Sequence, residues 1–190
     1  MATEERLQAD SSTIRAMLTI RRARRQDAGT ILALIRGLAA YERLTREVKA
    51  TAARIREHGF GRRRYFETLI CERDGRAIGF ALYFFTYSTF AGRPSLYLED
   101  LFVVPDERGR GAGRALLRAL ARVAHARGCG RMEWAVLDWN RPAIRFYERL
   151  GARLRRDWVL TRLSGRALRV LGAEPRGGHP RASPRRRRGR

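Results

Sequence analysis

Apolar and polar residues alternate along this chain in patterns that predict helices and strands in regular succession. Met17 to Ala23 alternates apolar and basic residues, which is typical of a half-exposed strand. Apolar residues then recur at helical spacing from Asp27 as far as Tyr41, which predicts a helix that Asp27 caps. A second, short helix is expected over 51–58, with Gly59 ending it.

Strand patterns dominate the middle of the chain. Residues 65–72 and 76–87 are β-rich runs, and Arg73-Asp74-Gly75 between them predicts a hairpin turn. Pro94 precedes a third strand of this group, over 96–104. The remaining pattern predicts, in order, a helix over 111–127 that Gly128 ends, a strand over 131–137, a helix from Asn140 to Gly151 and one or two strands within 154–163.

The most specific local signal is a glycine-rich turn between a strand and a helix. Gly109, Gly111 and Gly113 occupy alternate positions, so backbone amides can converge on one anion without obstruction by Cβ atoms. The helix start adds free N–H groups and its positive dipole end. Arginines flank the glycines and add positive charge. This pattern predicts a cradle for a diphosphate, and the alternative is a glycine-rich turn whose arginines only face water.

Two common diphosphate loops are excluded by the spacing. A Walker loop ends in Gly-Lys-Ser/Thr, and the single lysine of the chain, Lys49, lies far from the turn. A dinucleotide fingerprint that starts at Gly109 needs glycine at position 114, where the chain has Arg114. The pattern that remains is R-x-x-G-x-G, formed by Arg108, Gly111 and Gly113.

This spacing resembles the acetyl-CoA pyrophosphate loop of the GNAT acetyltransferases. The resemblance covers about residues 17–165 and is greatest to the diamine (spermidine/spermine) acetyltransferase branch. It implies an α/β (α+β) GNAT fold, in which helices flank a mixed central β-sheet and two splayed parallel strands bind acetyl-CoA. The segments that carry the resemblance to that branch are 38–42, 58–61, 79–87, 96–104, 108–113, 139–147 and 150–152.

The resemblance also assigns residues to the cosubstrate and the substrate. It implies that the strand ending at Val104 and the strand over 132–137 hold the pantetheine arm. The substrate-side positions are Tyr41, Glu42, Glu99 and Asp100, although Tyr41 and Glu42 also fit an ordinary helix end. No metal is implied. The residues expected to contact acetyl-CoA are Phe102, Val103, Val104, Arg108, Gly109, Arg110, Gly111, Ala112, Gly113, Arg114, Asn140 and Tyr147.

Tyr147 and Glu99 are the candidate catalytic residues. Tyr147 follows Asn140 by seven residues, two helical turns on the same side. The matching tyrosine of the family protonates the departing thiolate, and the alternative is packing on the helix face. Glu99 and Asp100 are costly to bury unpaired, so they indicate either a cationic amine or an internal ion pair with an arginine. Neighbouring residues of a strand point to opposite faces unless a bulge intervenes, so Glu99 is the first candidate for proton acceptor.

These residues predict an acetyl-CoA-dependent N-acetyltransferase that acts on the primary amine of a small molecule. Diamines, polyamines and lysine-like amino acids are the candidate substrates. The net charge of +22 repels a free polycation at long range, although salt screens such repulsion beyond about 8–10 Å. The alternatives are acetylation of a protein or peptide amine, or a nucleic-acid-associated protein that binds acetyl-CoA. The family branch also implies a homodimer.

Composition adds limits on domain organisation and location. The 190 residues suit a single domain over 17–171, between a flexible N-terminus at 1–16 and a disordered arginine-rich tail at 172–190. Residues 176–190 hold seven arginines and no acid, so the tail can contact anions or nucleic acid nonspecifically, or remain a solvated appendage. We expect no membrane span, no signal peptide and a cytoplasmic protein.

Overall fold

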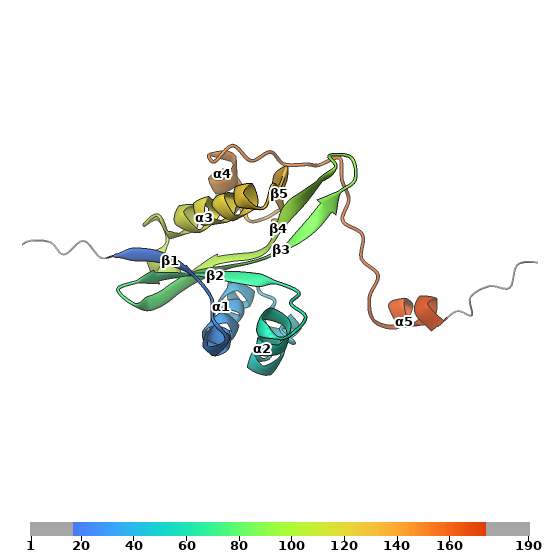
Figure 1. The fold of residues 1–190 in the computed structure, drawn as a ribbon, viewed down its shortest axis with the longest axis horizontal. Helices are drawn as coiled ribbons and strands as arrows, with labels where there is room; N and C mark the ends of the chain where they lie inside the picture. The colour runs from blue at the N-terminus through green and yellow to red at the C-terminus, as the bar shows by residue number, and fades with distance from the viewer. Residues whose placement is uncertain (1–16, 174–190) are drawn as a thin grey trace, which may run out of the picture. The chain divides into compact units, whose positions relative to one another are not determined.

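A computed structural model of the chain describes residues 17–173 (Figure 1). These residues form two compact units that divide after Leu137, and we describe each unit by itself. The predicted flexible segment at 1–16 lies outside the described residues, as does the predicted tail beyond Ala173.

The first unit is built on a five-stranded mixed sheet with the strand order β1-β2-β3-β4-β5. Neighbouring strands are antiparallel as far as β4, and β4 and β5 are parallel. The strands are β1 (Leu18–Arg22), β2 (Glu67–Arg73), β3 (Arg76–Ser88), β4 (Arg93–Val103) and β5 (Arg131–Trp134).

Helices cover both faces of this sheet. Figure 1 shows α1 (Ala28–Tyr41) and α2 (Ala52–Phe60) on one face and α3 (Ala112–Ala126) on the other. Leu34 of α1 packs against Phe80, Leu82 and Phe102 of the sheet. On α3, Leu116 is fully buried, and each such side chain contributes roughly 1.5–3 kcal/mol to stability. Three short 3-10 helices connect the elements, namely η1 (Arg25–Asp27), η2 (Thr45–Glu47) and η3 (Pro105–Glu107).

The predicted hairpin turn is confirmed, whereas two predictions about helix ends differ from the structure. Asp74 and Gly75 have φ values of 50° and 77°, the left-handed conformations that a tight β-hairpin turn requires. Gly59 does not end the second helix, because α2 continues to Phe60. Gly59 instead leaves space for the Phe66 ring, which lies directly beside it. Asp27 holds the N-cap position of α1, but its carboxylate bonds to Arg21 and to the Arg24 backbone instead of to the helix.

The second unit contains α4 (Arg141–Glu148) and α5 (Gly165–Ala173). Asn140 caps α4 as predicted, since its Oδ1 accepts a hydrogen bond from the Ala143 amide at 3.3 Å. The predicted strands within 154–163 are wrong. No strand of the described residues pairs with this segment, and Trp158 and Val159 are exposed. Their apolar side chains suggested burial, but a strand also needs a neighbour for its backbone groups.

Candidate active site

β4 contains one extra residue, which interrupts the alternation of its side chains between the two faces of the sheet. Leu98 pairs with Tyr83 across the sheet, whereas Asp100 pairs with the adjacent Leu82, so Glu99 is a β-bulge. Since neighbouring residues of β3 face opposite sides, Leu98 and Asp100 also face opposite sides. Leu82 packs against α1. The bulge therefore places Asp100 on the α1 face.

Three carboxylates gather beside this bulge and form what we call the acidic cluster: Glu42, Glu99 and Asp100. Glu99 is exposed and Asp100 is half-buried, and Glu42 is the residue that caps the end of α1. Burial and the charges of Glu99 and Glu42 raise the pKa of Asp100 to about 6. Burial also raises the pKa of Glu42. Within residues 17–173 none of the three is in an ion pair, so the alternative of an internal pair with arginine finds no support there.

The backbone of β4 has an open edge next to the acidic cluster. Pairing between β4 and β5 ends at Leu98 and Trp134, while β4 itself continues to Val103. Beyond Leu98, the β4 backbone therefore has no strand partner on its β5 side among the described residues. Backbone groups of this kind seek hydrogen bonds, and an extended chain such as a pantetheine arm supplies them. β5 ends at Trp134, three residues before Leu137 and at the point where its pairing with β4 ends, so the separation of two parallel strands stays a prediction.

The glycine turn adopts the conformation that an anion cradle needs. Gly109 and Gly111 have φ values of 74° and 87°, and nothing would lie within 4 Å of a Cβ at either position. These glycines therefore serve the backbone conformation, since the space around them is open. Gly111 is the N-cap of α3 and has no side chain with which to cap it, so the first amides of the helix are available to an anion. The residues present fit a bound diphosphate.

The arginines of the turn differ in what they contact. Arg108 Nε donates to the Val103 carbonyl at 3.0 Å, and its guanidinium lies 4.3 Å from the Tyr41 ring centre and 5.6 Å from that of Phe102. Arg108 thus folds back against the end of α1. Arg110 and Arg114 are exposed. The R-x-x-G-x-G pattern singled out Arg108, but it contains no information on which way each arginine side chain turns.

Glu107 is a buried residue of this turn that the sequence analysis missed. Its carboxylate accepts a hydrogen bond from Arg73 at 2.7 Å and lies near Arg76 and Arg110. An acid within an arginine-rich turn was a visible signal. Its main partner, however, lies 34 residues earlier in the chain, so no local pattern could identify it.

The two remaining candidates, Asn140 and Tyr147, lie in the second unit. Asn140 precedes α4 and Tyr147 lies near its end, where its ring centre is 5.4 Å from that of Phe146. All other predicted site residues lie in the first unit, which brings together the acidic cluster, Tyr41, the end of β4 and the glycine turn.

An apolar cleft of about 560 Å³ adjoins these residues on the α1 face. Tyr41, Phe102 and Val104 line it together with small residues of α1. Gly37 is one of these, and a Cβ there would lie 2.8 Å from the Phe102 ring. The sequence analysis did not predict this cleft.

The described part of the chain contains neither a metal-binding cluster nor a membrane-spanning helix. No group of histidine, cysteine or carboxylate side chains within residues 17–173 is arranged to hold a metal ion. No helix over the same residues is long and apolar enough to cross a membrane.

Comparison with known proteins shows the family to which the chain belongs. A model of the acetyltransferase (GNAT) family matches residues 33–152. The thialysine N-epsilon-acetyltransferase of Sus scrofa is 39% identical over 170 residues, which are 84% of this chain and 99% of that protein. An L-ornithine N5-acetyltransferase of Arabidopsis thaliana is 44% identical over 93 residues, covering 49% of this chain and 41% of the relative.

The fold is also found among solved structures. An integron cassette protein from the mobile metagenome of V. cholerae superposes with a TM-score of 0.70 at 24% identity, over 82% of this chain and 98% of that one. The predicted GNAT fold and N-acetyltransferase class are thus confirmed. The chain belongs to the acetyltransferase (GNAT) family, whose members use acetyl-CoA as cosubstrate.

Proposed function

We propose that this enzyme transfers an acetyl group from acetyl-CoA to the primary amine of a small cationic molecule, with lysine-like amino acids, diamines and polyamines as the candidate substrates. The acidic cluster beside the open edge of β4 is the observation that carries this proposal. Three unpaired carboxylates attract an ammonium group at the place where the thioester would lie. The names of the thialysine and ornithine acetyltransferases support the same class of substrate.

The glycine turn and β4 are the proposed binding site for acetyl-CoA, which supplies a thioester as the acetyl donor. Backbone amides of Gly109 to Gly113 and the start of α3 hold the diphosphate, with charge from Arg110 and Arg114. The open edge of β4 as far as Val104 holds the pantetheine arm, together with Phe102 and Val103. Arg108 supports the turn from behind through its contact with Tyr41. Asn140 and Tyr147 are the proposed contacts from the second unit.

Each remaining site residue has a proposed part in moving the substrate proton or holding the amine. Asp100 and Glu42 hold the ammonium form of the amine. Glu99, exposed at the bulge, accepts the proton directly or through water, so that a neutral amine can attack. The Tyr147 phenol donates a proton to the departing thiolate.

The test is release of free CoA with a panel of thialysine, lysine, ornithine, putrescine, spermidine and a lysine-containing peptide. We expect the small amines to be preferred over the peptide. Asp100→Asn should raise KM for the amine, whereas Glu57→Gln, which removes an exposed carboxylate on α2, should leave it unchanged. Preference for the peptide over every small amine would instead support acetylation of proteins. Acetylation of none of them, despite binding of acetyl-CoA, would contradict the proposal.

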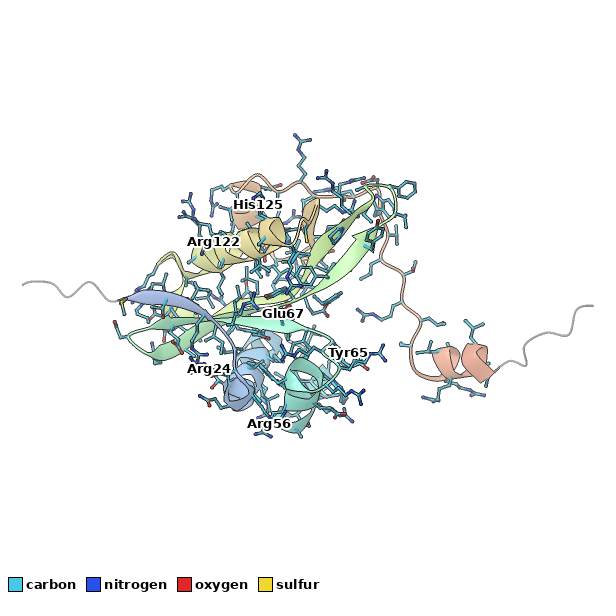
Figure 2. All side chains as sticks on the ribbon, viewed as in Figure 1. Arg24, Arg56, Tyr65, Glu67, Arg122 and His125 are labelled. Carbon is cyan, nitrogen blue, oxygen red and sulfur yellow. The ribbon has the colours of Figure 1, made fainter. Side chains whose placement is uncertain are left out.

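Net charge bears on the choice among these amines. Arginines such as Arg24, Arg56 and Arg122 lie exposed on the first unit (Figure 2). A dication or polycation must approach through this positive surface, while an amino acid carries its own carboxylate. Added salt should therefore lower KM more for spermidine than for lysine.

We also propose a single acetyltransferase domain over 17–171 and a cytoplasmic homodimer. Exposed apolar residues such as Phe90 (98% exposed) and Val159 (84%) supply surface that a second copy can bury. Light scattering at micromolar concentration tests the dimer.

The arginine-rich segment beyond Ala173 is proposed to bind anions or nucleic acid nonspecifically, and its deletion should remove that binding while leaving acetyl transfer intact.

A further inference from the structure

Glu107 is a buried carboxylate at the start of the glycine turn that none of the steps proposed above uses. It is the last residue of η3, directly before Arg108, and its side chain is only 6% exposed. A charge in such a place is stable only when cations and hydrogen bonds replace the water that it loses. Its neighbours therefore indicate what the charge does.

Three arginines from two parts of the chain surround this carboxylate. Arg73 Nε donates to Oε2 at 2.7 Å, and Arg76 Nη2 donates to Oε1 at 3.3 Å. Arg110 Nη1, from the turn itself, lies 3.9 Å from Oε2. The hydrogen bond from Arg73 in particular holds the pKa of Glu107 below its usual range. The carboxylate is thus charged at neutral pH.

The hairpin between β2 and β3 needs this anion. Arg73 ends β2, Arg76 begins β3, and the two pair directly across the hairpin. Like charges opposite each other destabilise a sheet unless something compensates them. Nη2 of Arg73 is buried without a hydrogen-bond partner in the described part of the chain. The hydrogen bond from its Nε to Glu107 therefore compensates for part of the water that this guanidinium has lost.

We propose that Glu107 is a positioning residue, which sets the affinity of the turn for the diphosphate of acetyl-CoA by fixing where the backbone leaves β4. The paired strands β2 and β3 hold the hairpin, and Glu107 attaches the turn to it through Arg73. This inference rests on the proposed function, because it assumes that the turn binds the diphosphate.

Electrostatics alone predicts that loss of the Glu107 charge changes the Kd of CoA in the opposite direction. Removing an anion near a diphosphate site raises the local positive potential and should strengthen binding. Loss of positioning should weaken it. The direction of the change in Kd therefore separates the two effects.

Three variants make the comparison. Glu107→Gln keeps the shape of the side chain and removes its charge. Asp106→Asn removes the charge of the preceding residue, which is exposed and in no ion pair among the described residues. Arg73→Lys keeps the positive charge but loses the hydrogen bond from Nε.

The readouts are the Kd of CoA by calorimetry, amide hydrogen exchange of residues 108–114 in the ligand-free protein, and steady-state kinetics. We expect Glu107→Gln and Arg73→Lys each to weaken CoA binding about tenfold, the order of a lost charged hydrogen bond. Exchange in the turn should become faster, and kcat at saturating acetyl-CoA should change little. Asp106→Asn should bind CoA as tightly as the unchanged protein, or more tightly.

Unchanged or tighter CoA binding by Glu107→Gln would overturn the inference, as would equal weakening by Asp106→Asn. If the unchanged protein binds no CoA, the proposed function fails, while the exchange measurement still decides whether Glu107 fixes the turn. Should Glu107→Gln not fold, Arg73→Lys decides the matter by the same two measurements, since it leaves the net charge unaltered.

Discussion

The guanidinium carbon of Arg108 lies 4.3 Å from the centre of the Tyr41 ring, so a cation–π contact joins the glycine turn to the end of α1. Arg108 belongs to the proposed cosubstrate site and Tyr41 to the proposed amine site. Glu42, whose carboxylate belongs to the acidic cluster, directly follows Tyr41 in the sequence. One contact thereby links the two binding regions of the first unit.

This contact predicts coupling between substitutions at its two ends. Arg108→Gln and Tyr41→Leu should be non-additive by about 0.5–1 kcal/mol in the free energy of unfolding, because either one removes the contact. Urea unfolding of the single and double variants measures this energy. Tyr41→Phe keeps the ring and is the control, and its effect should simply add to that of Arg108→Gln, because the contact survives the loss of the hydroxyl. Additive effects of Arg108→Gln and Tyr41→Leu would show that the two side chains do not act together.

Replacement of Tyr147 tests its proposed role as the general acid. Tyr147→Phe should lower kcat by about a hundredfold or more, with little change in the Kd of acetyl-CoA, because only the proton donor is lost. Single-turnover kinetics and calorimetry measure the two quantities. Tyr87→Phe, which removes a hydroxyl from an exposed residue of β3, should change neither. Weaker binding of acetyl-CoA with unchanged kcat would instead assign Tyr147 to cosubstrate binding.

The raised pKa of Asp100 predicts how stability depends on pH. Its pKa is about 6 in the folded protein against a reference value of 3.8, so between these values the folded state holds more protons than the unfolded state. Stability should therefore fall as the pH rises through this range. Asp100→Asn removes the effect and should gain up to about 3 kcal/mol relative to the unchanged protein between about pH 4 and pH 7.

Urea unfolding at both pH values measures this difference. Glu57→Gln serves as the control, because its exposed side chain should leave the pH dependence unchanged. A gain by Asp100→Asn that is equal at both pH values would show that the Asp100 carboxyl has no raised pKa.

Gly79 of β3 has no room for a side chain next to β4, the strand that is proposed to hold the pantetheine arm. A Cβ there would lie 2.6 Å from the Phe102 carbonyl oxygen and 3.2 Å from the Val103 side chain. Gly79→Ala should lower stability by about 1–3 kcal/mol and weaken CoA binding, because β4 must shift. Thermal unfolding and calorimetry measure both effects. Gly29→Ala has open space around it on α1 and should be neutral or stabilising.

Local chemistry explains which features the sequence predicted. The Asp74-Gly75 turn and the Asn140 cap each depend on a few adjacent residues, and so does the glycine turn after β4. The apolar pattern predicted the order of strands and helices, and the resemblance to the family then added how they are arranged in space. The strand prediction within 154–163 failed because pairing depends on a partner elsewhere, which an apolar pattern does not reveal.

Contacts between distant segments explain what the sequence could not give for the site. The bulge at Glu99 depends on the register of β4 against β3, and so does the position of Asp100 on the α1 face near Glu42. The stacking of Arg108 on Tyr41 likewise joins residues far apart in the chain. Glu99 and Asp100 were both identified from their place in an apolar strand and from the family resemblance, but their different exposure required the sheet.

The bulge at Glu99 also determines how this enzyme can vary. A substitution at position 99 changes one exposed side chain and leaves the rest of β4 in place. Deletion of that residue would make Leu98 and Asp100 neighbours in a regular strand, so Asp100 would stay opposite Leu82 and positions 100–103 would keep their present faces. Removal of a residue between Asp100 and Val103 would instead exchange the two faces for the positions that follow it. The bulge is therefore the place in β4 where chain length can change without turning the end of the strand over, and engineering of substrate preference should keep the residue count from Asp100 to Val103 fixed.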